Sequence, residues 1–324
     1  MRNPEEGVLA KTKKPLKKSS RKRAKRPLQE VLRKGASKPD PFTIVIVANP
    51  ALEAPWNSGN FVADPIISNQ PAFNACAQYI LKALFGRLPN QREKFLANPS
   101  IDPYVRVVSL FVPGLSAQDA NALVAQDGVS NLLVARRSVF VPFLTRYRLQ
   151  ADVAYAVSAS SSHDRASAWF TSDDDTRPGD AFVLDGQSYH HRKYNLIPGT
   201  VAIHTNSRSL TALHEFGHAL SSYTNGMVVD LYVDGGAGLN NKRGRPIPPT
   251  FASYKGIALA TDMVRDGLGY PPGWQSYHCE LIDPAVPAVM DNYWLASSGI
   301  PEYCFHDKIT REFLIDRLLV KISR

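Results

Sequence analysis

The 324-residue chain lacks several features that would place it in a specialised class. It has no run of 18 apolar residues, so no membrane-spanning helix is expected. Its three cysteines, Cys76, Cys279 and Cys304, match neither a zinc-finger spacing nor a dense disulfide framework, although a Cys279–Cys304 contact stays open. No repeat of 20 to 50 residues is visible. With 44% apolar and 21% charged residues, the chain is expected to be globular.

The start of the chain also lacks the apolar core of a signal peptide. Residues 1–10 contain no long apolar run, and a strongly basic stretch follows them at residues 11–26. This absence favours a cytoplasmic protein.

Acidic residues are scarce only at one end of the chain. Residues 1–40 hold 14 Lys and Arg against 4 Asp and Glu, whereas residues 41–324 hold 24 against 25. Like charges repel, and the few large apolar residues of the first segment cannot offset the entropy of ordering it. We therefore expect residues 1–40 to be a disordered basic arm. It is either a handle that weakly contacts nucleic acid or another anionic surface, or a solvated tail.

Helical and strand patterns alternate through the rest of the chain. β-branched or alternating apolar runs predict strands, and apolar spacings of three and four predict helices. The expected strands are 42–48, 104–112, 152–158, 181–185 and 200–205, and the expected helices are 71–85, 117–126 and 310–323. This mixture predicts an α/β (α+β) domain over residues 41–324 with a mixed sheet. Residues 41–226 would hold the sheet and the helix described next, and residues 227–324 a smaller C-terminal subdomain.

The pattern that carries chemistry is His214-Glu-Phe-Gly-His218, an HExxH sequence within residues 207–226. Ser207 or Ser209 is suited to cap the start of a helix there, and Asn225-Gly226 is suited to end it. On a helix, His214 and His218 project from one face and can bind one zinc ion. Glu215 beside them is suited to act as a general base toward a water molecule. The sequence thus predicts a zinc-binding helix with one catalytic carboxylate.

Two histidines leave a catalytic zinc site one protein ligand short. Residues 227–236 alternate like a strand and place Asp230 and Asp234 on one face. Asp230 is our choice for the third ligand because it is nearer the turn that would bring the chain back toward the metal. Asp234 and His278 are the alternatives, and either aspartate is otherwise an ordinary turn or strand-edge residue.

With these residues in place, the chain resembles the zincin metallopeptidases, and among them the metzincins. The His214–His218 motif with Asp230 and Tyr232 after it is similar to the IgA-specific metalloendopeptidase family. The resemblance implies that Pro287–Tyr293 forms a methionine turn with Met290 under the metal, unless Met290 is simply a core residue. It also implies that Thr200–Thr205 is an edge strand for an extended peptide. Tyr293 or Tyr232 would then donate to the developing oxyanion.

The chain departs from the metzincin pattern directly after the motif. Ser221 and Thr224 stand where the usual glycine and third histidine would be. The expected function is a zinc-dependent metallopeptidase that acts on a protein or peptide substrate. Two alternatives stay open: a DNA-associated protease held by the basic arm, and a non-catalytic, zinc-stabilised binding domain.

Overall fold

A computed structural model gives the fold. The structure describes residues 26–35, 41–128, 131–171, 181–184, 187–190, 198–207, 209–221, 299–306 and 308–322, and the short segments 227–228, 252–254, 257–259, 276–277, 288–290 and 293–295.

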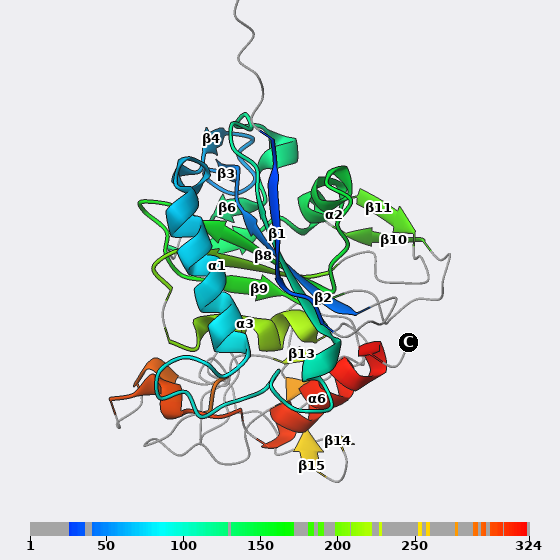
Figure 1. Ribbon diagram of the computed structural model, residues 1–324. Helices are drawn as coiled ribbons and strands as arrows, with labels where there is room; N and C mark the ends of the chain where they lie inside the picture. The colour runs from blue at the N-terminus through cyan, green and yellow to red at the C-terminus, as the bar shows by residue number, and fades with distance from the viewer. Residues whose placement is uncertain are drawn as a thin grey trace, which may run out of the picture.

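A six-stranded mixed sheet is the centre of the molecule (Figure 1). Its strand order is β1-β5-β2-β8-β12-β9, in which the four central strands are parallel and both outer strands are antiparallel to their neighbours. Long apolar runs form the central strands because parallel strands are buried on both faces. The strands are β1 (Leu28–Arg33), β2 (Phe42–Ala48), β5 (Val105–Phe111), β8 (Val153–Ser158), β9 (Ser167–Trp169) and β12 (Gly199–His204).

Each face of this sheet has its own hydrophobic core. In β2, Ile44 and Ile46 face the core shared with helices α1, α3 and α6, whereas Val45 and Val47 face the core shared with α2. Figure 1 shows α1 lying along the first of these faces with α3 near its lower end. The helices are α1 (Gln70–Leu84), α2 (Arg137–Arg146), α3 (Thr211–Leu220) and α6 (Lys308–Ile322).

A second, four-stranded mixed sheet with the order β4-β3-β6-β7 packs on the α2 side. The predicted α/β class with a mixed sheet is therefore confirmed. The strands of this sheet are β3 (Ala51–Glu53), β4 (Phe61–Ala63), β6 (Val124–Gln126) and β7 (Leu133–Ala135). The other described strands form two-stranded sheets: β10 (Ala181–Leu184) with β11 (Gln187–His190), β13 (Met227–Val228) with β16 (Ser276–Tyr277), and β14 (Ala252–Tyr254) with β15 (Ile257–Leu259). Short 3₁₀ helices are η1 (Pro65–Ser68), η2 (Asp102–Tyr104), η3 (Asp119–Asn121), η5 (Tyr293–Leu295) and η6 (Pro301–Tyr303).

The prediction that residues 1–40 form a disordered arm is wrong for residues 28–33, which form β1. This strand pairs antiparallel with β5, and Arg33 forms an ion pair of 2.7 Å with Asp102 and lies 4.5 Å from the ring centre of Phe85. Backbone pairing does not depend on the net charge of a segment, so the excess of Lys and Arg in residues 1–40 did not exclude a strand there. Residues 1–25 lie outside the described residues.

The predicted helix at residues 117–126 is also wrong. Its first part forms η3 and its last part forms β6, which pairs with β3 on one side and β7 on the other. Asn121 donates to the carbonyl oxygen of Ser116, a local bond that competes with helix formation. Pairing within the second sheet therefore decides the conformation of a segment with weak helical preference.

The strand predicted at residues 200–205 exists as β12, but it is not an edge strand. It pairs with β8 along its length and with β9 through Thr200–Ala202. The edge of the sheet is β9, three residues long and antiparallel to β12.

None of the helices in the described ranges is long and apolar enough to cross a membrane.

The boundary between the sheet region and a C-terminal subdomain at residue 226 stays a prediction. Helix α6 contacts both α3 and β2 and so belongs to the main core.

Cys304 is a buried thiol whose sulfur lies 3.9 Å from the carbonyl oxygen of Tyr293. Cys279 lies outside the described residues.

A buried carboxylate, Glu93, holds residues 299–306 against the loop after α1. It accepts hydrogen bonds from the backbone N–H of His306 at 3.0 Å and from His306 Nδ1 at 3.3 Å, and Arg311 Nε lies 3.7 Å away. Burial alone would raise the pKa of Glu93. The hydrogen bonds and charge of His306, with the charge of Arg311, outweigh burial and lower this pKa from 4.5 to about 2.

Glu93→Gln should therefore lower the free energy of unfolding at neutral pH and flatten its acid dependence. Because the folded pKa is depressed, the stabilisation is present above about pH 4.5 and is lost as the pH falls toward 2. The full shift corresponds to about 3 kcal/mol. Urea denaturation between pH 7 and pH 2 measures it, with Glu302→Gln as the control. Parallel pH profiles for wild type and Glu93→Gln would contradict the assignment.

Candidate metal centre

Helix α3 contains His214, Glu215 and His218 and is almost wholly buried. It lies so close to β12 that a Cβ atom at Gly199 would overlap the carbonyl oxygen of Ala219. The absence of a side chain at Gly199 therefore allows the helix to sit directly on the sheet.

The ends of α3 differ from the prediction. The helix begins after Leu210 without a side-chain cap, and the predicted cap Ser209 has a left-handed backbone with φ of 58°. It ends at Leu220, where Ser221 Oγ donates to the carbonyl oxygen of His218 at 2.6 Å. Asn225-Gly226, the predicted end, lies outside the described residues. The predicted helix is thus real but shorter at both ends.

The two histidines face each other. His214 Nε2 and His218 Nε2 are 3.3 Å apart, with the ring planes at 86° and the ring centres 4.9 Å apart. The predicted convergence of the two imidazoles on one point is confirmed.

The other nitrogen of each ring faces a backbone carbonyl oxygen. His214 Nδ1 lies 2.7 Å from the oxygen of Val289, and His218 Nδ1 lies 2.7 Å from the oxygen of Val228. A carbonyl oxygen only accepts hydrogen bonds, so each Nδ1 carries the hydrogen. In the neutral rings both Nε2 atoms then carry lone pairs, and these lone pairs face each other.

Facing lone pairs at this distance suit a shared cation. Two nitrogens bound at about 2.0–2.1 Å to a tetrahedral zinc ion are about 3.3–3.4 Å apart. The observed 3.3 Å between the Nε2 atoms matches this spacing. Carbonyl acceptors on Nδ1 are also the usual way in which a protein fixes the tautomer of a metal-binding histidine. The pair therefore fits two positions of a tetrahedral zinc site.

Glu215 is buried between the helix and the sheet, with 6% of its surface exposed. Its negative charge reaches Tyr155 on the central strand β8. Burial raises the pKa of the Tyr155 hydroxyl well above its usual value, and the charge of Glu215 raises it further. The Tyr155 hydroxyl donates to the carbonyl oxygen of Ala212 at 2.8 Å, which ties the first turn of α3 to the sheet.

The segment around Met290 lies against α3, where the resemblance to metzincins had placed it. A Cβ atom at Gly217 would lie 2.8 Å from the sulfur of Met290, which is fully buried. The Tyr293 ring is centred 5.5 Å from the His214 ring, and its hydroxyl lies 2.8 Å from Thr211 Oγ1. The small Gly217 thus makes room for the thioether against α3.

None of the residues predicted as a third ligand is among those that the structure describes. Asp230, Asp234 and His278, together with Tyr232, fall outside them, and the described residues contain no group of three His, Cys, Asp or Glu side chains able to hold a metal. Two neighbours of these candidates are described. Val228 of β13 accepts from His218, and it pairs with Tyr277 of β16.

No protein-family model, curated protein or solved structure matches the chain.

The resemblance to metzincins and to the IgA-specific metalloendopeptidases therefore rests on the motif residues alone. Sequence reasoning did not find the two carbonyl acceptors, Val228 and Val289, or the Tyr155–Glu215 interaction. No side-chain pattern could have found the first two, because every residue carries a carbonyl group.

Proposed function

We propose that this protein is a zinc-dependent metallopeptidase. The observation that carries the proposal is the pair of Nε2 atoms, 3.3 Å apart, in two rings whose Nδ1 atoms both face carbonyl oxygens. His214 and His218 would hold the metal together with a third side chain. Bound zinc would supply a Lewis acid that polarises a peptide carbonyl group and makes water acidic enough to react near neutral pH.

Glu215 would move the proton in this reaction. Its carboxylate adjoins His214 in the helix and is shielded from solvent. A carboxylate in this position can take a proton from the attacking water and deliver it to the nitrogen of the departing amine. The proton ends on the amine, and Glu215 returns to its starting state. Tyr293, beside the His214 ring, is our candidate donor to the developing oxyanion.

A peptide substrate suits the sheet edge beside α3. Strand β9 is the edge of the six-stranded sheet, and it contacts α3. An edge strand can pair with an extended peptide through backbone hydrogen bonds, which recognise the main chain of any sequence. We therefore propose β9, in place of Thr200–Thr205, as the strand that a peptide would pair with, although Ser167 already donates to the carbonyl oxygen of Leu133 beside it.

Asp230 remains our choice for the third ligand, with His278 as its rival. Asp230 follows Val228 by two residues, and His278 follows Tyr277 by one. The described strands next to them, β13 and β16, pair in parallel, and Val228 of β13 accepts from His218. Asp234 is four residues further along the chain than Asp230 and is the less direct choice.

We expect Asp230→Ala to reduce zinc content and peptide hydrolysis together, and His278→Ala to leave both near wild type. Zinc per chain after dialysis and cleavage of a quenched-fluorescent peptide library measure the two quantities. A chelator should stop the wild-type reaction, and added zinc should restore it. Loss of zinc in His278→Ala alone would reassign the ligand. Full zinc occupancy with no cleavage of any peptide would favour a non-catalytic zinc-stabilised domain.

A further inference from the structure

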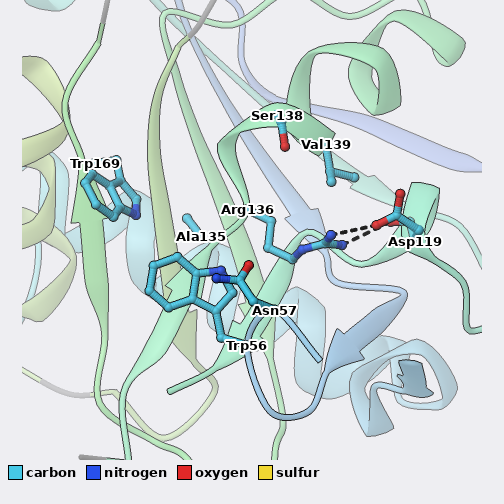
Figure 2. A pocket seen from close by; sticks show the side chains of 8 residues that line it. All are labelled: Trp56, Asn57, Asp119, Ala135, Arg136, Ser138, Val139 and Trp169. Carbon is cyan, nitrogen blue, oxygen red and sulfur yellow. Dashed lines mark hydrogen bonds and ion pairs between the residues drawn. The ribbon is translucent and has the colours of Figure 1, made fainter. Parts of the chain in front are cut away.

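A second concave site lies on the opposite face of the six-stranded sheet from α3. Its cavity has a volume of about 380 Å³, within the range of small-molecule sites. Trp169, which lines it, packs with the core on the α2 side, whereas the residues of α3 pack with the other core. The cavity is lined by Trp56, Asn57, Asp119, Ala135, Arg136, Ser138, Val139 and Trp169 (Figure 2). It is therefore separate from the candidate metal centre.

Two indole side chains, those of Trp56 and Trp169, line the cavity. Figure 2 shows Trp169 on one side of the cavity and Asp119 on the other, with Trp56 and Asn57 at the front. Trp56 is 43% exposed and comes from the turn between β3 and β4. A tryptophan offers a large apolar face together with an N–H donor, which suits contact with an amphipathic ligand.

The charged groups of the cavity neutralise each other. Among its lining residues only Arg136 and Asp119 are charged, and they form an ion pair of 2.6 Å. Arg136 also donates to the carbonyl oxygens of Asp119 and Ala122 and pairs with the buried Glu53 at 2.9 Å. With its N–H groups engaged in this way, Arg136 is poorly placed to bind an anion. Asp119 shares one oxygen with Arg136, so a cation would meet a carboxylate that is already neutralised.

The wall is also rigid. The Trp56 backbone N–H donates to the carbonyl oxygen of Gln126 at 2.8 Å, and the Gly59 N–H donates to Glu53 Oε1 at 3.0 Å. The loop that carries Trp56 is thus fastened to β6 and to the carboxylate behind Arg136. A preformed wall does not have to be ordered when a ligand binds.

We infer that this cavity binds a neutral saccharide. A pyranose ring has faces of C–H groups, which suit indole surfaces, and a rim of hydroxyls, each of which both donates and accepts. The Asn57 amide can both donate and accept, and the Asp119 carboxylate accepts. Polar groups of this kind together with two indole rings match a sugar better than they match a single ion.

Binding of neutral trisaccharides to the full chain tests this inference. The probes are cellotriose, maltotriose, mannotriose and triacetylchitotriose, with choline and inorganic phosphate as charged rivals. Titration is followed by calorimetry and by ligand-observed NMR. We expect at least one trisaccharide to bind saturably, and Trp56→Ala to weaken it at least about tenfold. Asp119→Asn, which keeps the side-chain shape, should weaken it as well.

Trp294→Ala is the matched control, because Trp294 is exposed to a similar extent, 46%, and does not line the cavity. It should bind the trisaccharide as wild type does. Three results would overturn the inference: no neutral trisaccharide binds, Trp56→Ala and Trp294→Ala bind equally well, or choline or phosphate binds in place of the sugars. Trp169 belongs to β9, the edge strand of the proposed function, but Trp56 and Asp119 do not. None of these results measures zinc binding or peptide hydrolysis, so the two proposals can fail separately.

Discussion

Glu215→Gln should keep its zinc and lose peptide hydrolysis by about 10²–10⁴-fold, the usual contribution of a general base. The amide has the shape of the carboxylate but cannot accept the proton of the attacking water. His214 and His218 keep their carbonyl partners in this variant, since Val289 and Val228 are untouched. The loss should therefore appear in kcat while the metal content stays that of wild type.

Glu302→Gln is the control for this experiment, because Glu302 lies in η6, outside α3 and the segments that contact its histidines. Cleavage of the peptide library and zinc per chain are measured on the same preparations. If Glu215→Gln hydrolyses peptides at the wild-type rate, Glu215 has no role in proton transfer. If it loses its zinc, Glu215 supports the site instead of acting on water.

Gly199→Ala should destabilise the protein by about 2–4 kcal/mol, a large effect for one methyl group. The added Cβ would overlap the backbone carbonyl of Ala219, which, unlike a flexible side chain, cannot rotate away. The helix must instead shift from β12, and His218 is the residue next to Ala219. The same substitution should thus weaken zinc binding as well as folding.

Gly128→Ala provides the matched control, since a Cβ at Gly128 would have no neighbour within 4 Å. Urea denaturation gives the free energy of unfolding for both variants, and competition with a zinc-binding dye gives the metal affinity. Equal stability of Gly199→Ala and Gly128→Ala would show that α3 is not held against β12 as closely as the structure has it.

Side-chain periodicity predicted the central strands of the six-stranded sheet correctly. The runs at Phe42–Ala48 and Val153–Ser158 are central strands because their side chains must be buried on both faces, and the sequence shows this directly. β1 was missed because backbone pairing with β5, not apolar side chains, holds it. Segment 117–126 was assigned wrongly because its neighbours in the second sheet, which are distant in sequence, determine its conformation.

In the candidate site, too, residue spacing predicts one part and only the fold determines the other. The spacing of His214 and His218 predicted their convergence because a helix repeats about every four residues. The acceptors for their Nδ1 atoms are carbonyl groups of Val228 and Val289, and only the fold can select these. The saccharide cavity had no signal in the sequence, because Trp56 and Trp169 are distant in the chain and line one cavity only in the folded protein.

The zinc content of purified wild type and of the double variant His214→Ala/His218→Ala tests the central claim most directly. After dialysis against metal-free buffer, wild type should hold about one zinc ion per chain and the double variant none, with circular dichroism confirming that both are folded. Equal zinc in the two proteins would contradict the account. In that case α3 would be a structural helix without a metal.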